Sequence, residues 1–168
     1  GNRPILRDMS ALLVADTSPI ISLLLIEQLD LLEQLFPDFL LPQAVWQELN
    51  THREIAAYQP GLASLAERVR KIVLHFPISG IEWGETEAIL LYQEVGADYL
   101  LIDDRKAREK AELLGIRCLG TLGLLYLARQ RGMVDALRPL FSALLQNRRY
   151  YAKVYLNVFL ERAGERPL

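Results

Sequence analysis

The chain is poor in the residues that build the commonest metal and disulfide sites. It contains one cysteine, Cys118, and two histidines, His52 and His75, in 168 residues. A single cysteine excludes an internal disulfide and a cysteine-based zinc site, and a buried apolar thiol is its simplest interpretation. Two histidines set apart in sequence do not form a histidine-rich metal site. A metal site in this protein would therefore have to use oxygen ligands.

Long apolar runs and glycine-rich phosphate loops are also absent. No apolar stretch reaches 18 residues, so the sequence predicts no transmembrane helix. The first ten residues contain no signal-peptide core, and a cytoplasmic location is the default expectation. Neither a Walker-type loop nor G-x-G-x-x-G occurs, which argues against nucleotide-cofactor chemistry. The formal net charge of −2 indicates no particular partner.

Short apolar runs alternate with helical segments along the whole chain. The expected strands are 11–16, 38–41, 98–103 and 116–120, and residues 71–78 are expected to form a strand or an extended segment. The expected helices are 17–29, 29–36, 42–50, 61–70, 84–96, 104–115, 121–132, 135–147 and 151–164. This order predicts an α/β fold whose parallel sheet is covered by helices on both faces. We expect a single domain over residues 1–168, with 1–10 a flexible extension and 150–168 a helical tail.

Helix-end signals accompany several of these segments. Ser18 before Pro19 resembles a side-chain cap followed by a proline in the first turn, and Thr121 is a second expected cap. Gly96 and Gly115 follow helical segments and are expected to end them. These signals predict where the helices meet the strands.

Carboxylates stand where two of the expected strands end. Asp16 ends the first strand, and Asp103 and Asp104 end the fourth. Ligands of open parallel sheets bind beyond the carboxyl ends of the strands, so these acids converge if the two strands are neighbours. Glu85 begins a helix and can face the same edge, whereas the position of Glu48, near the end of its helix, is less certain.

Each acid alone has a simpler explanation. The strand-ending acids could cap the helices that follow, Glu85 and Glu87 could complement a helix dipole, and Glu48 could be a solvated helix residue. Together they fit an oxygen-ligand site, because clustered carboxylates raise one another's pKa unless a cation lies among them. Mg²⁺ or Mn²⁺ suits such a site. Such a metal binds phosphate and activates water, so phosphodiester hydrolysis is the leading reaction class.

Five segments resemble, in order, motifs of the PIN-domain family, the small metal-dependent nucleases that include the VapC toxins. They are VADTSPIISL, LPQAVWQEL, GETEAI, GADYLLIDDRKAR and GTLGLLYLARQRG, and the resemblance spans roughly residues 12–145. It is greatest to an uncharacterised branch of that family. It implies a three-layer α/β/α sandwich with a parallel sheet of about five strands. It also implies a Mg²⁺- or Mn²⁺-dependent ribonuclease acting on single-stranded RNA, as a toxin of a toxin–antitoxin pair. The alternative is a catalytically weak PIN-like module that binds RNA or a protein partner.

The resemblance also assigns roles to residues by position. It implies metal binding by acids from separate segments, which here are Asp16, Glu85, Asp103 and Asp104, with Glu48 as a further catalytic acid. Leu101 and Ile102 precede the last acids, where the family commonly has a threonine, so the choice between Asp103 and Asp104 stays open. The glutamate at position 85 stands where aspartate is common.

Polar and basic residues around the acids are candidates for holding RNA. The candidate substrate-binding residues are Thr17, Ser18, Arg105 and Thr121. Other basic residues follow in the chain: Lys106, Arg108, Lys110, Arg129, Arg131, Arg148 and Arg149. Neutralising phosphates supplies most of the affinity for nucleic acid, although a solvated helix face explains these charges equally well.

The end of the chain leaves two alternatives open. Tyr150 and Tyr151 could stack on bases, but packing is the simpler interpretation. The amphipathic tail either covers the core of the domain or serves as a partner surface. The family resemblance implies a homodimer and an antitoxin protein as partners.

Overall fold

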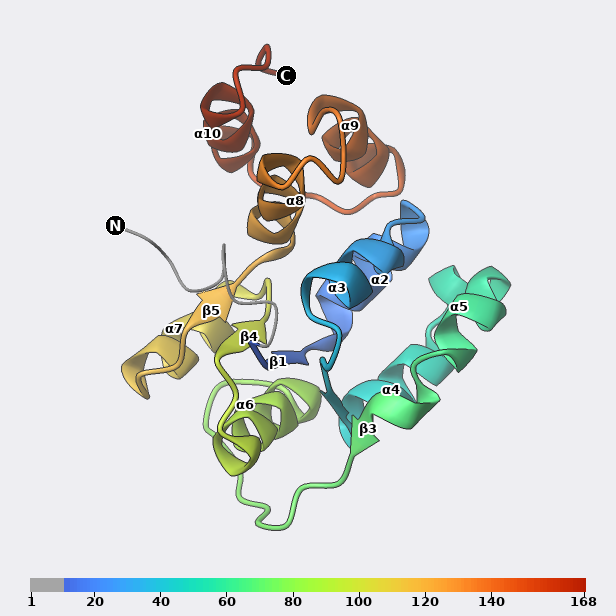
Figure 1. Cartoon of the computed structure of the whole chain (residues 1–168). Helices are drawn as coiled ribbons and strands as arrows, with labels where there is room; N and C mark the ends of the chain where they lie inside the picture. Colours follow the sequence, from blue (N-terminus) through green and yellow to red (C-terminus); the bar gives the residue numbers. More distant parts are fainter. Residues whose placement is uncertain (1–10) are drawn as a thin grey trace.

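The computed structural model describes residues 11–168, so the expected extension 1–10 lies outside the described residues. The strands are β1 (Leu13–Ala15), β2 (Leu41–Pro42), β3 (Val69–Arg70), β4 (Tyr99–Leu101) and β5 (Cys118–Leu119). The α-helices are α2 (Thr17–Leu25), α3 (Leu29–Leu35), α4 (Gln43–Thr51), α5 (Gln59–Ala63), α6 (Trp83–Val95), α7 (Arg105–Leu113), α8 (Thr121–Gln130), α9 (Arg138–Gln146) and α10 (Lys153–Arg162). Two 3₁₀ turns, η1 (Arg53–Tyr58) and η2 (Ala66–Arg68), flank α5 (Figure 1).

The strands form two small parallel sheets that are joined edge to edge. One sheet has the order β1-β4-β5 and the other pairs β2 with β3. A parallel bridge between Val14 and Leu40 joins them. There the Ala15 N–H bonds the Leu40 carbonyl, and the Leu40 N–H bonds the Leu13 carbonyl, both at 2.9 Å. The combined order is β3-β2-β1-β4-β5, which confirms the predicted parallel sheet and places β1 at its centre.

Successive side chains of the strands point to opposite faces of the sheet, which separates two hydrophobic cores. Leu13 and Leu101 face the larger core, where they pack with buried residues of α2, α3 and α8. Val14 and Leu100 face the opposite core, with buried residues of α6 and α7. A strand buried on both faces needs apolar residues at every position, as the run LLVA provides. The predicted α/β/α arrangement is therefore confirmed.

The segment leading to α6 differs from the expectation. Residues 61–70, predicted as one helix, form the end of α5, η2 and β3. The Arg68 guanidinium explains the early strand: it donates to the carbonyls of Pro37 and Phe39 at 2.7 and 3.1 Å and lies over the Phe39 ring. These tertiary contacts hold β3 beside β2 and override local helix propensity.

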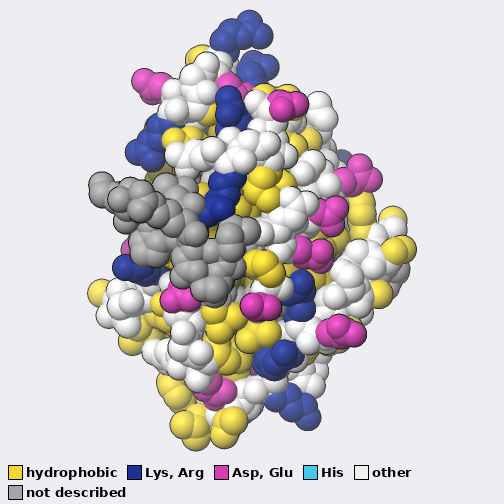
Figure 2. Space-filling model, viewed as in Figure 1, with side chains coloured by type: hydrophobic (Ala, Val, Ile, Leu, Met, Phe, Trp, Pro, Cys, Tyr) yellow, Lys and Arg dark blue, Asp and Glu magenta, His cyan; other side chains and the backbone are white. Residues whose placement is uncertain are grey.

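Residues 71–78, predicted as a strand or an extended segment, lie outside the sheet in an irregular loop. Val73 and Leu74 are largely exposed, and Phe76 is half-exposed. Figure 2 shows hydrophobic side chains gathered at the lower end of the molecule, where Figure 1 draws this loop. Ile72, by contrast, is buried in the core beneath α6 and α7, and Ile78 packs against that core. Part of the apolar composition that suggested a strand therefore lies on the surface, and part anchors the loop.

Two expected helix caps are displaced. Asp16 is the N-cap residue of α2, and Gly120 that of α8, so Ser18 and Thr121 lie inside their helices. Pro19 tolerates its position because the first N–H groups of a helix have no intrahelical acceptor. Gly96 ends α6 as predicted, at a left-handed φ of 63° that glycine adopts at little cost.

The C-terminal tail packs on the domain. Leu156 and Leu160 of α10 are buried in the larger core, and α10 contacts α8. The opposite face of α10 exposes Val154 and Tyr155. No helix of residues 11–168 is both long and apolar enough to cross a membrane.

Candidate active site

Asp16 lies where the central strand β1 ends. Its backbone N–H bonds the Leu101 carbonyl of β4 at 2.9 Å, and the residue is 4% exposed. Burial raises the pKa of the Asp16 carboxyl to about 8, with further contributions from Glu85, Glu48 and Asp103. The Thr17 backbone N–H opposes this rise only in part. The buried Asp16 carboxylate is therefore strongly destabilised unless a proton or cation accompanies it.

Glu48 reaches the same edge from α4. Its carboxylate accepts a short hydrogen bond from the Thr17 hydroxyl. It also lies against Gly84 in the first turn of α6, where an added β-carbon would come within 2.9 Å of Glu48 Cδ and 3.0 Å of Oε2. The glycine of GETEAI thus leaves room for the Glu48 carboxylate between α4 and α6.

Glu85 belongs to the first turn of α6. Its Oε1 accepts the Glu82 backbone N–H at 2.9 Å, as in a capping box. Burial raises the pKa of the half-buried Glu85 carboxyl, and Asp104, Glu82 and Glu48 add to the rise. The second oxygen of Glu85 accepts no hydrogen bond from a residue in the described part of the chain.

Asp103 is held by three hydrogen bonds. Its Oδ1 accepts the Thr121 backbone N–H at 2.8 Å, and its Oδ2 accepts the hydroxyls of Thr121 and Tyr151 at 2.7 and 2.8 Å. Gly120 allows this approach, because a β-carbon there would lie 3.2 Å from Asp103 Oδ1. Asp103 is therefore fixed to both α8 and the segment before α10.

Asp104 accepts fewer hydrogen bonds than Asp103 does. It is the N-cap residue of α7, and its Oδ2 accepts the Ala107 N–H at 3.0 Å. Asp104 is exposed, and its charge contributes to the raised pKa of Glu85. The two neighbouring acids thus have different environments: Asp103 faces Asp16, and Asp104 faces Glu85.

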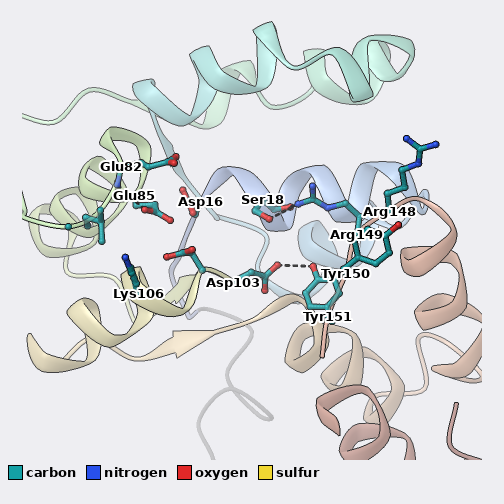
Figure 3. A pocket seen from close by; sticks show the side chains of 13 residues that line it. Asp16, Ser18, Glu82, Glu85, Asp103, Lys106, Arg148, Arg149, Tyr150 and Tyr151 are labelled. Atoms are coloured by element: carbon teal, nitrogen blue, oxygen red, sulfur yellow. Dashed lines mark hydrogen bonds between the residues drawn. The ribbon is translucent and has the colours of Figure 1, made fainter. Parts of the chain in front are cut away.

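The acids open into one cleft of about 860 Å³, a volume within the range of ligand sites. Asp16, Glu85, Asp103 and Asp104 all line it, and Glu48 lies close enough to Asp16 and Glu85 to raise the pKa of each. Figure 3 shows Asp16 between Glu85 and Asp103. The five predicted acids are thus brought together. Among residues 11–168, however, no three such side chains are close enough together to enclose a metal ion directly.

The candidate substrate-binding residues have different surroundings. Thr17 is buried and donates to Glu48, and Thr121 is fully buried and donates to Asp103. Ser18 lines the cleft. Arg105 is not among the residues lining the cleft, because its guanidinium pairs with Glu109 one turn along α7, at 3.2 Å. Lys106, the next residue, lines the cleft instead.

Sequence reasoning missed two features of the cleft. Glu82 lines it, and its spacing of three residues from Glu85 was the available signal, because that spacing is typical of a capping box. The second is a network that joins the C-terminal segment to α2. Arg149 donates to the Ser22 hydroxyl at 2.9 Å and the Ser18 carbonyl at 3.1 Å, and Tyr151 and Ser22 share a hydrogen bond of 2.9 Å. No local pattern predicts this network.

The donor set fits a hard divalent cation. The candidate ligands are carboxylate oxygens, which Mg²⁺ and Mn²⁺ prefer. Within residues 11–168 no lysine or arginine forms an ion pair with Asp16, Glu48, Glu85, Asp103 or Asp104. No direct ion pair in this part of the chain therefore offsets the repulsion among these acids, and a divalent ion would relieve it.

Comparisons with known proteins identify the family of the chain. Residues 12–165 match a family model described as DUF3368, a PIN domain. The chain is similar to the solved structure of a PilT N-terminus domain protein from the hyperthermophilic archaeon Sulfolobus solfataricus P2. The two are 20% identical, with a TM-score of 0.48, over 68% of this chain and 90% of that one. No curated protein matches. Because the family model covers nearly all of the described residues, the chain belongs to the PIN-domain family.

Proposed function

We propose that this protein is a Mg²⁺- or Mn²⁺-dependent ribonuclease that hydrolyses phosphodiester bonds of single-stranded RNA. One observation carries the proposal: the buried Asp16 carboxyl, with its pKa raised to about 8, is surrounded by other acids at the carboxyl edge of a parallel sheet. Such an arrangement lowers the stability of the fold, and a reaction that requires a bound cation would explain why the acids are grouped. Membership of a family of typically metal-dependent nucleases supports the same reaction.

The proposed ligands are Asp16, Glu85, Asp103 and Asp104, either directly or through water. A carboxylate has about four acceptor positions. Asp103 uses three of them for Thr121 and Tyr151 and keeps one, whereas Asp104 uses one. A divalent ion bound there would neutralise charge on the phosphate and lower the pKa of the attacking water.

Other side chains of the site position the acids or attract the substrate. Thr17 fixes Glu48 beside Asp16, where the Glu48 carboxylate can accept a hydrogen bond from water or a proton from the attacking group. Lys106 lines the cleft and supplies a positive charge for a substrate phosphate. Burial of Asp16 limits the water that competes for the ligand oxygens.

The test is cleavage of a labelled single-stranded RNA by the full chain, in Mg²⁺, in Mn²⁺ and in EDTA. The parent should cleave only with the metal, and Asp16→Asn should lose most of the activity. Asp98→Asn is a suitable control, because Asp98 is an acid outside the cleft. Equal cleavage by the parent and Asp16→Asn, or none by either, rejects the ribonuclease proposal.

A role as the toxin of a toxin–antitoxin pair is a separate proposal, which rests on the family resemblance. The expected result is growth arrest when the chain is expressed alone, and relief of the arrest by Asp16→Asn. Arrest that is equally strong with both chains would point to a cause other than RNA cleavage.

A second candidate function is a PIN-like module that binds RNA or a protein without turnover. Two observations favour it: the described acids enclose no ready-made metal site, and Asp103 is already occupied by three donors. Binding of single-stranded RNA that is unaffected by Mg²⁺ and followed by no cleavage would support this function over the first.

A further inference from the structure

The end of the cleft away from Glu82 and Glu85 is formed by the segment between α9 and α10. Arg148, Arg149, Tyr150 and Tyr151 of this segment all line the cleft. Figure 3 shows them on the side opposite Glu82 and Glu85. The cleft thus has an acidic end and a basic, aromatic end.

Side chains of this segment alternate in their roles. Arg149 is bound to Ser18 and Ser22, and Tyr151 is bound to Asp103. Arg148 and Tyr150 are exposed, Tyr150 to 77%. Neither of these two side chains forms a hydrogen bond or ion pair with a residue of 11–168. Arg149 and Tyr151 anchor the backbone of the segment, so Arg148 and Tyr150 project from a fixed backbone at the edge of the cleft.

The backbone at Arg148 has a left-handed conformation. Arg148 follows the end of α9 with a φ of 60°, a left-handed conformation in which glycine is the favoured residue. An arginine there costs conformational energy that a glycine would not. Glu27, outside the cleft, has nearly the same φ of 57°, so this conformation serves to design a variant: glycine at position 148 removes the side chain without straining the backbone.

We propose that Arg148 and Tyr150 bind the single-stranded RNA substrate: Tyr150 stacks on an unpaired base, and Arg148 contacts a backbone phosphate beside it. This proposal rests on the proposed ribonuclease function, and it names how the substrate is held. An exposed aromatic ring next to an unpaired cation is the combination that binds single strands without sequence preference. The acids at the other end then face a phosphate of the same strand.

The experiment measures RNA binding separately from cleavage. A fluorescein-labelled single-stranded oligouridine is titrated in EDTA with the full-length Asp16→Asn chain, so that the proposed cleavage does not proceed during the titration, and anisotropy gives Kd. Tyr150→Ala should weaken binding at least about fivefold, because stacking on an aromatic ring contributes that much per base. Tyr150→Phe keeps the ring and should stay within about twofold of the parent. Tyr155→Ala, a control at an exposed tyrosine outside the cleft, should do the same.

Arg148→Gly gives a sharper test than alanine does. It relaxes the left-handed backbone, so the urea midpoint should stay equal or rise, while RNA binding weakens. The slope of log Kd against log salt should fall by about 0.7 for one lost phosphate contact on a single strand. Glu27→Gly relaxes the same conformation (φ 57°) outside the cleft and should not weaken binding.

The outcomes separate this proposal from the ribonuclease function. If the parent cleaves RNA but Tyr150→Ala and Arg148→Gly bind and cleave as the parent does, the RNA-holding role is rejected and the nuclease stands. If both variants weaken binding while the parent cleaves nothing in Mg²⁺ or Mn²⁺, the RNA-holding role stands and the nuclease is rejected. An equal loss of binding in Tyr150→Ala and Tyr155→Ala also rejects the role assigned to Tyr150.

Discussion

The carboxylate of Glu48 lies over the α-carbon of Gly84, so closely that the first turn of α6 has no room for a β-carbon. The hydroxyl of Thr17, the first residue of α2, donates to the same carboxylate. Three helices therefore meet at one side chain, and Gly84 determines where that side chain can lie.

Replacing Gly84 by alanine should impair activity without unfolding the protein. The new methyl group would displace the Glu48 carboxylate, and a shift of about 1 Å at a catalytic group can reduce the rate about 100-fold. Alanine is favoured over glycine in a helix by about 1 kcal/mol, which offsets part of the local strain. We expect RNA cleavage to fall at least about tenfold, with a free energy of unfolding in urea within about 1 kcal/mol of the parent.

A double-mutant cycle shows whether this effect passes through Glu48. Gly84→Ala should add little to the loss already caused by Glu48→Ala, because the displaced group is then absent. Losses that multiply independently would mean that Gly84 acts on some other part of the site.

Asp103→Ala should destabilise the fold more than Asp104→Ala. The first change leaves the Thr121 N–H and two hydroxyls without their acceptor, at about 1–3 kcal/mol for a buried unpaired group. The second removes one helix cap, which contributes about 1 kcal/mol. Each variant also removes a negative charge that faces another acid, so both variants gain stability from reduced repulsion. Urea unfolding without metal measures the difference, and a larger loss for Asp104→Ala would contradict these contacts.

Without metal, stability should fall as pH rises from 5 to 8. The Asp16 carboxyl has its pKa raised from an ordinary 3.8 to about 8, so between these values the folded state binds more protons than the unfolded state. Stability is then greatest at the low end and is lost as pH rises through the folded pKa, by at most about 1.4 kcal/mol per pH unit. Glu85, also raised, acts in the same direction. Urea unfolding in EDTA should show this slope, and Asp16→Asn should flatten it.

Magnesium should stabilise the protein, increasingly so as pH approaches 8. A cation competes with the proton on Asp16, so its affinity rises as that carboxyl becomes easier to deprotonate. At free Mg²⁺ concentrations above Kd, each tenfold increase in concentration adds about 1.4 kcal/mol to the free energy of unfolding. Thermal unfolding with Mg²⁺ against EDTA measures the effect. Asp16→Asn should show little shift, and an equal shift in both proteins would mean that the ion binds elsewhere.

Much of the fold was predictable because its signals are local. The run LLVA has no polar residue, so it predicts a strand buried on both faces, and Gly96 ends α6 where the helical pattern stops. The strand before α6 was misplaced, because β3 depends on a contact between Arg68 and the distant Phe39. Apolar composition in 71–78 could not reveal that Val73 and Leu74 lie on the surface while Ile72 is buried.

The acids of the site were predictable for a topological reason. Asp16 and Asp103 end neighbouring parallel strands, and parallel strands end at one edge. What holds those acids was not predictable, because the Tyr151–Asp103 bond joins residues 48 positions apart. Arg105 adjoins the acids in sequence, yet a helix turns successive side chains by about 100°. Lys106 lines the cleft instead.

The bond from Tyr151 to Asp103 also orders events during synthesis. Tyr151 is added 48 residues after Asp103, which is about 2 to 10 s later on a translating ribosome. The same late segment carries Arg149, which fixes the start of α2. A nascent chain that has already built its sheet therefore lacks the last support of its acidic site. The acidic site is therefore complete only after the C-terminal segment has been made.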